Sequence, residues 1–305
     1  MARLVLGSRG SALALAQVRI VRDALRAMHP DLSIEVKTIT TSGDRRQEPG
    51  AGEGIAAGLK GLFTKEIQDA LLDGSIDAAV HSLKDLPGVT PPALGLAAVL
   101  PRADASDLLI SAAYAGLESL PHGARIGTGS VRRRRQIEWL RPGLEVVDLR
   151  GNVPTRLAKL TSLSLDAIVL AQAGLERLGY SLDRGRLHCD AGDFNASKID
   201  ILPAIGQGAI GLEIRRDDET ARTILEAIDH APSHTCVRVE RELLRLLNGD
   251  CRLPVGARAT LDGAGILRAE AIVFHDASPP ARAAASGPAD DPEGLALDLF
   301  RKLSK

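Results

Sequence analysis

Short apolar and β-branched runs alternate with amphipathic helical patterns through the first two thirds of the chain, and this alternation restricts the fold more than any other feature. The first series contains RLVLG, SALALAQVRIVRDALRAM, SIEVKTIT, TKEIQDALLDG and DAAVHS. A second series follows Pro101 and runs from ARIGT to GLERLG. Such alternation is typical of βαβ units with mainly parallel sheets. We therefore predict two α/β domains.

Two segments are predicted to connect these domains, one at about residues 99–107 and the other at about 201–218. Two crossings would return the chain to the first sheet, which is the connectivity of a hinged two-domain cleft. The tail differs, because the helical pattern VRVERELLRLL precedes a polar turn and the strand-like runs VGARATL and ILRAEAIVF. This order predicts a small α+β domain at the end of the chain.

The expected domains are residues 1–100 with 206–228, residues 104–203, and residues 229–305. The glycine-rich segment 43–61 is predicted to be a mobile loop. The Ala/Pro-rich stretch 277–290 is predicted to be a surface loop that precedes a last helix.

Composition excludes several classes of partner. Lys and Arg (38) nearly balance Asp and Glu (39), so the net charge of -1 gives no overall field that would attract nucleic acid or a membrane. Aromatic residues make up only 2%, which removes the stacking platforms of single-strand nucleic-acid binders. Cys189, Cys236 and Cys251 form no closely spaced framework, which favours a reducing compartment. Arg9 interrupts the N-terminal apolar run, and no stretch is long enough to span a bilayer, so we expect a cytoplasmic protein.

Basic residues follow several predicted strands, where ligands of parallel α/β sheets bind. Arg9, Lys84 and Arg150 each follow one strand, and Arg132 and Arg133 follow another, at the start of a helix that Ser130 would cap. Cations are disfavoured at a helix N-terminus, so an anion is expected to offset the penalty. The alternative is that the arginine run forms a solvated helix face. Arg156 and Arg177 lie in predicted helices, where each alone is compatible with the surface.

Two further residues could carry chemistry. Cys251 follows a helix stop in the polar turn LLNGDCRLPVG, between an acid and an arginine, which favours an accessible, partly activated thiolate. A small buried hydrophobe is the alternative. Asp85, beside Lys84 in HSLKDLP, can stay ionised and stabilise positive charge on a substrate, or it can be a turn residue before Pro87.

A metal site is not predicted. His230, His234 and Cys236 have the spacing of metal ligands. Pro232 lies between the two histidines and disfavours a shared helical face. The chain also lacks a Walker A loop, and GSRGSA is not a dinucleotide-binding fingerprint.

The sequence resembles the porphobilinogen deaminases, also called hydroxymethylbilane synthases. The likeness covers nearly the whole chain and weakens at residues 187–200 and beyond about 277. It is carried by GSRGSALALAQ, GLKGLFTKE, AVHSLKDLP, GTGSVRRR, LRGNVPTRL, AGLERLG, LPAIGQGA and NGDCRLPVG. The resemblance implies two hinged, doubly wound α/β domains of the periplasmic-binding-protein-like class, with a small C-terminal α+β domain. It implies a transferase that links four porphobilinogen units head to tail, releases ammonia and yields 1-hydroxymethylbilane in tetrapyrrole and heme biosynthesis.

The resemblance also implies roles for single residues. A dipyrromethane cofactor would be joined through a thioether to Cys251, and Asp85 would contact the pyrrole N–H groups as the catalytic group. The matched cofactor-holding positions are Lys84, Ser130, Arg132 and Arg133. The matched positions for the incoming substrate and its carboxylates are Arg9, Ser11, Lys60, Arg150, Arg156 and Arg177. Gln207 matches a structural position, and the expected partners are porphobilinogen and the growing polypyrrole chain, bound by a monomer.

Three positions depart from the family pattern. Ala56 stands where a second lysine usually precedes Lys60 by four residues, which puts a loop-closing contact to substrate in question. Ser106 replaces a common arginine, and Gly129 replaces a common serine. A different class of function remains as the alternative: a non-catalytic binding protein whose two lobes close on an anion, which would need the arginines but neither Cys251 nor Asp85.

Overall fold

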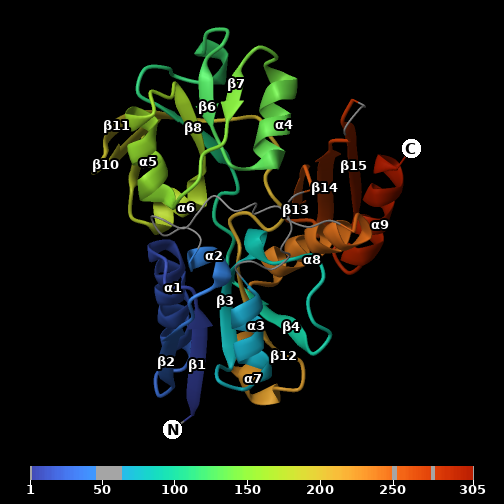
Figure 1. Ribbon diagram of the computed structural model, residues 1–305. Helices are drawn as coiled ribbons and strands as arrows, with labels where there is room; N and C mark the ends of the chain where they lie inside the picture. Colours follow the sequence, from blue (N-terminus) through green and yellow to red (C-terminus); the bar gives the residue numbers. More distant parts are fainter. Residues whose placement is uncertain (1, 46–63, 249–252, 276–278, 305) are drawn as a thin grey trace.

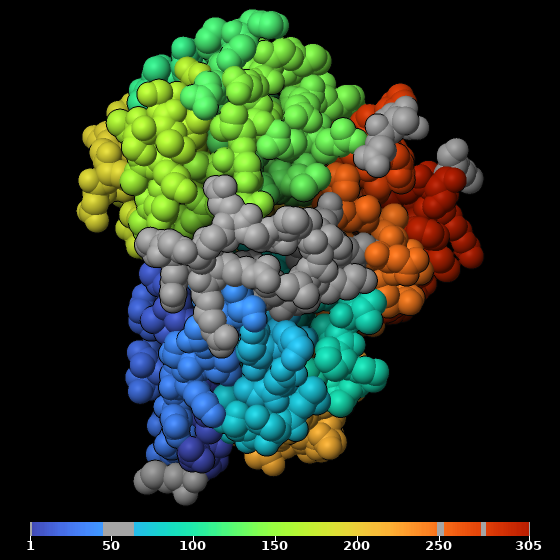
Figure 2. All heavy atoms as spheres, in the orientation of Figure 1, coloured from blue at the N-terminus to red at the C-terminus, as the bar shows by residue number. Residues whose placement is uncertain are grey.

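The computed structural model of the chain describes residues 2–45, 64–248, 253–275 and 279–304. Within this part of the chain the strands form three sheets, each with its own helices (Figure 1). In the space-filling view, the lobe in blue and cyan lies below the lobe in green and yellow, and the orange and red C-terminal part lies beside both (Figure 2).

The first sheet has the strand order β2-β1-β3-β12-β4. Its strands are β1 (Arg3–Ser8), β2 (Ser33–Thr38), β3 (Ala78–Ser82), β4 (Leu94–Val99) and β12 (Ile210–Arg215). β1, β2 and β3 pair in parallel, whereas β12 is antiparallel to both β3 and β4. The predicted return to the first sheet is therefore found, but the sheet is mixed. The chain leaves the sheet at the carboxyl end of β4 and returns to that same end, where β12 begins between β3 and β4, so β12 runs antiparallel to both.

Helices cover both faces of this sheet. α1 (Ala12–Met28) and α7 (Glu219–Glu226) lie on the face where Leu6 and Val21 are buried. α3 (Lys65–Leu72) lies on the other face, with Val5 and Leu71. Successive residues of β1 thus supply opposite cores, as expected for a strand that is buried on both faces. α2 (Ser42–Arg45) is a short helical turn that follows β2 in the chain.

The second sheet has the order β7-β6-β8-β5-β11-β10-β9. Its strands are β5 (Asp107–Ser111), β6 (Arg125–Gly127), β7 (Glu145–Val147), β8 (Ala167–Ala171), β9 (Ser181–Asp183), β10 (Arg186–Cys189) and β11 (Gly192–Lys198). Only β6, β7 and β8 are parallel, so this sheet is mixed as well. One face packs on α4 (Val131–Leu140), and the other on α5 (Val153–Ser162) and α6 (Gln172–Arg177). Two single turns, η1 (Leu83–Asp85) and η2 (Leu117–Ser119), follow β3 and β5.

The third sheet is antiparallel, with the order β13-β14-β15. It consists of β13 (Val255–Leu261), β14 (Ile266–Val273) and β15 (Ala281–Pro288), and it packs on α8 (Ala231–Leu246) and α9 (Pro292–Leu303). The prediction of a surface loop over 277–290 is wrong for β15. Its Ala-rich sequence has low β propensity, but a continuous ladder with β14 makes it a strand, so tertiary pairing overrides the local signal.

Two segments cross between the first and second sheets, 100–106 and 199–209, and they contact each other. Ala103 N donates to Gly208 O at 3.1 Å. Gly206 and Gly208 have φ values of +69° and +84°, and a Cβ at Gly208 would lie 2.5 Å from Ala103 O. Only glycine tolerates both conditions, which explains the GQG sequence at this point. The predicted fold class, two α/β lobes joined by two crossings plus an α+β unit, is confirmed.

Candidate active site

A cavity of about 260 Å³ lies where the two α/β lobes, the C-terminal unit and the second crossing segment meet. Its polar lining comes from four separate stretches of sequence: Lys84, Asp85, Ser130, Arg132, Arg133, Arg156 and Gln207. Its apolar lining includes Leu86, Ile205, Leu244, Leu253 and Val255. The structure thus brings together six of the predicted site residues, one carboxylate and four cations among them.

Asp85 reaches the cavity because β3 ends at Ser82 and the chain turns through η1 at the carboxyl edge of the first sheet. Leu83 is buried and anchors this turn, which leaves the Asp85 side chain half-buried. Among the described residues, none donates a hydrogen bond to the Asp85 carboxylate. Both of its oxygens can therefore accept hydrogen bonds from a bound ligand.

Arg132 and Arg133 reach the cavity from the first turn of α4, which Ser130 caps as predicted by accepting a hydrogen bond from Arg133 N at 3.4 Å. Both arginines are buried, and both form ion pairs of 2.7 Å with Asp107. Burial alone would raise the pKa of Asp107, but Arg132, Arg133 and Gln207 hold it well below its ordinary value. The anion expected at this helix end is thus present in the chain itself, and the arginine run is not simply a solvated face.

Lys84 and Arg156 complete the positive charge around the cavity. Burial lowers the pKa of Lys84 to about 8; Asp85 opposes this shift, while Arg133 and Arg132 add to it. Burial, together with Arg133, also lowers the pKa of Arg156, whose Nε donates to Gly151 O at 2.7 Å. Each of these cations makes the charged form of its neighbours less favourable. A bound polyanion would relieve this repulsion, so the cluster favours a polyanionic ligand.

Four predicted substrate residues are not among those that line this cavity. Arg9 forms an ion pair of 2.5 Å with Asp44, and Ser11 caps α1. Arg150 is exposed, and its Nε donates to Asp148 at 2.8 Å. Arg177 Nη2 donates to Gly208 O at 2.5 Å, and burial lowers its pKa to about 10. Arg177 therefore links the second lobe to the returning crossing segment.

Cys251, Lys60 and Ala56 lie outside the described residues. The described residues on both sides of 249–252 do reach the site, since Leu244 in α8 and Leu253 before β13 line the cavity. Of the other two cysteines, Cys236 is buried in the core of the third sheet, and Cys189 lies at the end of β10.

Sequence reasoning missed Asp107 and the apolar walls of the cavity. Asp107 lies in the polar run PRADASD, where nothing local distinguishes it from a loop residue. The unexplained cations at the start of α4 were the one signal that an acid should be near. Leu244 and Leu253 belong to the C-terminal unit, so only the tertiary fold brings them to the site.

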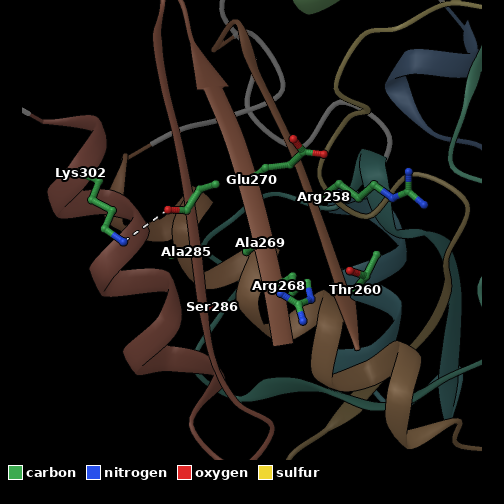
Figure 3. Close-up of a pocket in the computed structure, with 9 residues that line it drawn as sticks. Arg258, Thr260, Arg268, Ala269, Glu270, Ala285, Ser286 and Lys302 are labelled. Carbon is green, nitrogen blue, oxygen red and sulfur yellow. Dashed lines mark hydrogen bonds between the residues drawn. The ribbon is translucent and has the colours of Figure 1, made fainter. Parts of the chain in front are cut away.

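A larger cavity, of about 680 Å³, lies over the open face of β13, β14 and β15 (Figure 3). Its charged side chains are largely neutralised by neighbours, since Arg268 pairs with Asp262, and Lys302 pairs with Asp298. Its described lining residues all belong to the C-terminal unit and not to the strand ends of the two α/β lobes. The smaller cavity is therefore the better candidate, because it combines an acid, clustered cations and perturbed pKa values.

The side chains that line the cavity suit a specific kind of ligand. Lysine and arginine donors suit carboxylates, and a carboxylate with free oxygens can accept N–H bonds and stabilise a cation. Apolar side chains beside them can contact the faces of flat rings. The site therefore fits a ligand that carries several carboxylates on rings with N–H groups.

Comparisons with known proteins agree with this chemistry. Residues 4–223 match the family model described as porphobilinogen deaminase, dipyromethane cofactor binding domain, and residues 234–305 match the porphobilinogen deaminase C-terminal domain. The porphobilinogen deaminase of Moorella thermoacetica is 44% identical over 303 residues, which cover 99% of this chain and 93% of that protein. The one from Desulforudis audaxviator is 45% identical over 304 residues, with 98% and 94% covered. This chain belongs to the porphobilinogen deaminase family.

Proposed function

We propose that the enzyme joins four porphobilinogen units head to tail, with Asp85 as its catalytic group and Cys251 as the attachment point of its dipyrromethane cofactor. The family's activity lies in tetrapyrrole biosynthesis, and the product would be 1-hydroxymethylbilane. One observation carries the proposal: a single cavity combines the half-buried Asp85 carboxylate with four cations from different segments. Each pyrrole of the substrate bears an acetate, a propionate and an N–H group, which match these partners.

The residues around the cavity fit a dipyrromethane. Lys84, Arg132 and Arg133 offer donors to its carboxylates, and Ser130 adds a hydroxyl at the start of α4. Arg132 Nε is buried and has no partner among the described residues, so a ligand acceptor would satisfy it. When bound, this group supplies the pyrrole carbon to which the first substrate unit is joined.

Asp85 would act on the substrate by charge stabilisation. When ammonia leaves the aminomethyl group of porphobilinogen, positive charge spreads over the methylene carbon and the pyrrole nitrogen. A carboxylate that accepts the pyrrole N–H stabilises this charge more in the transition state than in the ground state, which is the condition for catalysis. The oxygens of Asp85, which accept no hydrogen bond from the described residues, suit this role.

The remaining cations would serve the incoming unit and the growing polypyrrole chain. Arg156 lines the cavity, and among the described residues no hydrogen-bond partner of its Nη groups competes with a ligand carboxylate. Arg9, Ser11, Arg150 and Arg177 are proposed as further substrate contacts, together with Lys60. For Arg9 and Arg150 this role requires substrate to compete with Asp44 and Asp148.

The domain boundaries and the location of the protein are part of the same proposal. We assign the domains to residues 1–100 with 206–228, to 104–203 and to 229–305, in accordance with the three sheets. We propose a cytoplasmic monomer that binds neither nucleic acid nor membranes. None of the described helices has the length and apolar character that crossing a membrane would need.

The test is the intact mass of purified protein under denaturing conditions. The parent protein should carry the added mass of two linked pyrroles, and Cys251→Ser should fold without it. Cys236→Ser and Cys189→Ser are matched controls that should keep the added mass. Burial raises the pKa of the Cys236 thiol, which makes it a poor nucleophile. An adduct that persists in Cys251→Ser would contradict the assignment.

A further inference from the structure

Within the described part of the chain, Asp107 is the one acid that forms ion pairs with both Arg132 and Arg133. It is the first residue of β5, immediately after the first crossing segment, and it is fully buried. Its Oδ2 accepts from Arg132 Nη2 at 2.7 Å, and its Oδ1 accepts from Arg133 Nη2 at 2.7 Å and Nε at 3.1 Å. Neither oxygen faces the cavity as a ligand group, because Asp107 is not among the lining residues.

Each arginine is held at two points. Besides Asp107, Arg132 Nη1 donates to Leu202 O at 2.6 Å, and Arg133 Nη1 donates to Val169 O at 2.8 Å. A planar guanidinium that is bonded on two sides cannot rotate without breaking one bond, so its remaining N–H groups have fixed directions. Both side chains still line the cavity, which means that these fixed donors are available to a ligand there.

The same carboxylate is tied to both crossing segments. Gln207, in the second crossing, donates through Nε2 to Asp107 Oδ1 at 2.9 Å and to Ala105 O, in the first crossing, at 2.6 Å. Gln207 is itself buried between two glycines with positive φ. The acid that orients the arginines therefore sits at the junction between the two lobes.

We propose that Asp107 is a positioning residue, which fixes Arg132 and Arg133 to the junction of the two crossing segments. The position of the arginine donors that bind ligand carboxylates is then determined by this junction and not by either lobe alone. A movement of one lobe relative to the other must pivot on these two segments. Groups that are bonded at the pivot are displaced least by such a movement. The anchored end of the growing chain would stay in place while the substrate side of the cavity changes.

This inference rests on the proposed role of Arg132 and Arg133 as cofactor-holding residues, and an ordinary buried ion cluster is the alternative. A purely structural cluster affects how much folded, cofactor-loaded enzyme is obtained. A positioning group changes the turnover of each loaded molecule, because misplacement by about 1 Å can cost on the order of a hundredfold in rate. The two interpretations therefore predict different values of kcat per molecule of cofactor-loaded enzyme.

The experiment compares Asp107→Asn with Asp104→Asn in the holoenzyme, with kcat normalised to the cofactor load from intact mass. Asn keeps the size of the side chain and removes its charge. Asp104, three residues earlier, pairs with Lys198 outside the cavity, so its variant should behave as the parent. We expect Asp107→Asn to lower kcat roughly 10- to 100-fold while KM for porphobilinogen stays within about twofold. A parent-like kcat per loaded enzyme would overturn the proposal.

Gln207→Met provides the test if Asp107→Asn does not fold, because it keeps both ion pairs and removes only the link to the crossing segments. We expect a kcat lower by roughly three- to tenfold with KM retained, since the hydrogen bonds to Asp107 Oδ1 and Ala105 O are lost while both ion pairs remain. An unchanged kcat in this variant would overturn the role of the junction.

A double-mutant cycle identifies the route of the effect. Asp107→Asn should cost much less in an Arg133→Lys background than in the parent, because the residue acts through Arg133. Equal costs in both backgrounds would contradict the proposal. If Arg132→Leu and Arg133→Leu kept full cofactor load and kcat, the proposed cofactor-holding role of the two arginines would be wrong. If these variants were impaired but Asp107→Asn behaved as the parent, only the positioning role of Asp107 would be wrong.

Discussion

Arg102 Nη1 lies 2.6 Å from Glu240 Oε1, and Arg102 Nη2 lies 3.1 Å from Glu240 Oε2, so the first crossing segment forms a bidentate ion pair with the middle of α8. Glu240 also accepts from Gly206 N at 2.7 Å and from Ala259 N at 2.9 Å. One buried carboxylate thus joins both crossing segments to the C-terminal unit. α8 ends at Leu246, five residues before Cys251 in the sequence, so this contact fixes the helix that precedes the proposed attachment point.

Glu240→Gln should destabilise the protein strongly, because it leaves Arg102 without its charge partner in a buried site. The expected loss in the free energy of unfolding is about 3 kcal/mol. Glu293→Gln is the matched control, since its ion pair with Arg238 is half-exposed and should contribute less than about 1 kcal/mol. Urea unfolding of the two variants measures both values. Equal, small losses would mean that the Arg102 pair does not hold the junction.

Activity should depend on pH through Lys84. Its pKa lies at about 8, below the usual lysine value, so the group is a cation at neutral pH and loses its proton as pH rises through about 8. Loss of one cation from the cavity should weaken binding of the anionic substrate, so kcat/KM, which reports the free enzyme, should fall over that range. Lys84→Arg keeps the charge and should shift this fall to higher pH. A fall at the same pH in both enzymes would assign the titration to another group.

Arg156→Leu should reduce kcat/KM by roughly 10- to 100-fold, because a charge-assisted hydrogen bond contributes about 1.5–3 kcal/mol. Arg150→Leu should also weaken turnover, but less, since Arg150 is exposed and paired with Asp148. Lys159→Leu, on the same helix as Arg156, is the control and should behave as the parent. Melting temperatures should change little in all three. Parent-like kinetics of Arg156→Leu would remove it from the substrate site.

The fold could be predicted from the sequence where the signal was local. Strand and helix alternation gave both lobes, and the helix cap at Ser130 and the two crossings were found where expected. β15 was missed because alanine, glycine and proline give no strand signal, and its state depends on pairing with β14. The antiparallel direction of β12 also escaped prediction, since direction follows from where the chain re-enters the sheet.

The sequence predicted which charged residues form the site, but it did not predict how they are arranged. Strand-end position pointed to Lys84, Arg132 and Arg133, and the penalty for cations at a helix start pointed to an anion. Sequence alone could not tell whether that anion was a ligand or Asp107, because the burial of an acid is a tertiary property. Arg9 and Arg150 also follow strands, yet each pairs with a nearby acid instead of lining the cavity.

Asp85, as the group that stabilises the substrate cation, is central to the proposed mechanism. Asp85→Asn keeps the shape of the side chain and removes its charge, and Asp85→Glu keeps the charge but shifts its position. Loss of a preorganised stabilising group costs on the order of a hundredfold in kcat, so the Asn variant should lose at least that much and the Glu variant less. The decisive measurement is steady-state turnover of porphobilinogen by the three proteins, per mole of cofactor determined by intact mass. We expect turnover to decrease in the order parent, Asp85→Glu, Asp85→Asn, with a drop of about a hundredfold or more in Asp85→Asn. Near-parent turnover by Asp85→Asn would show that Asp85 is not the catalytic group.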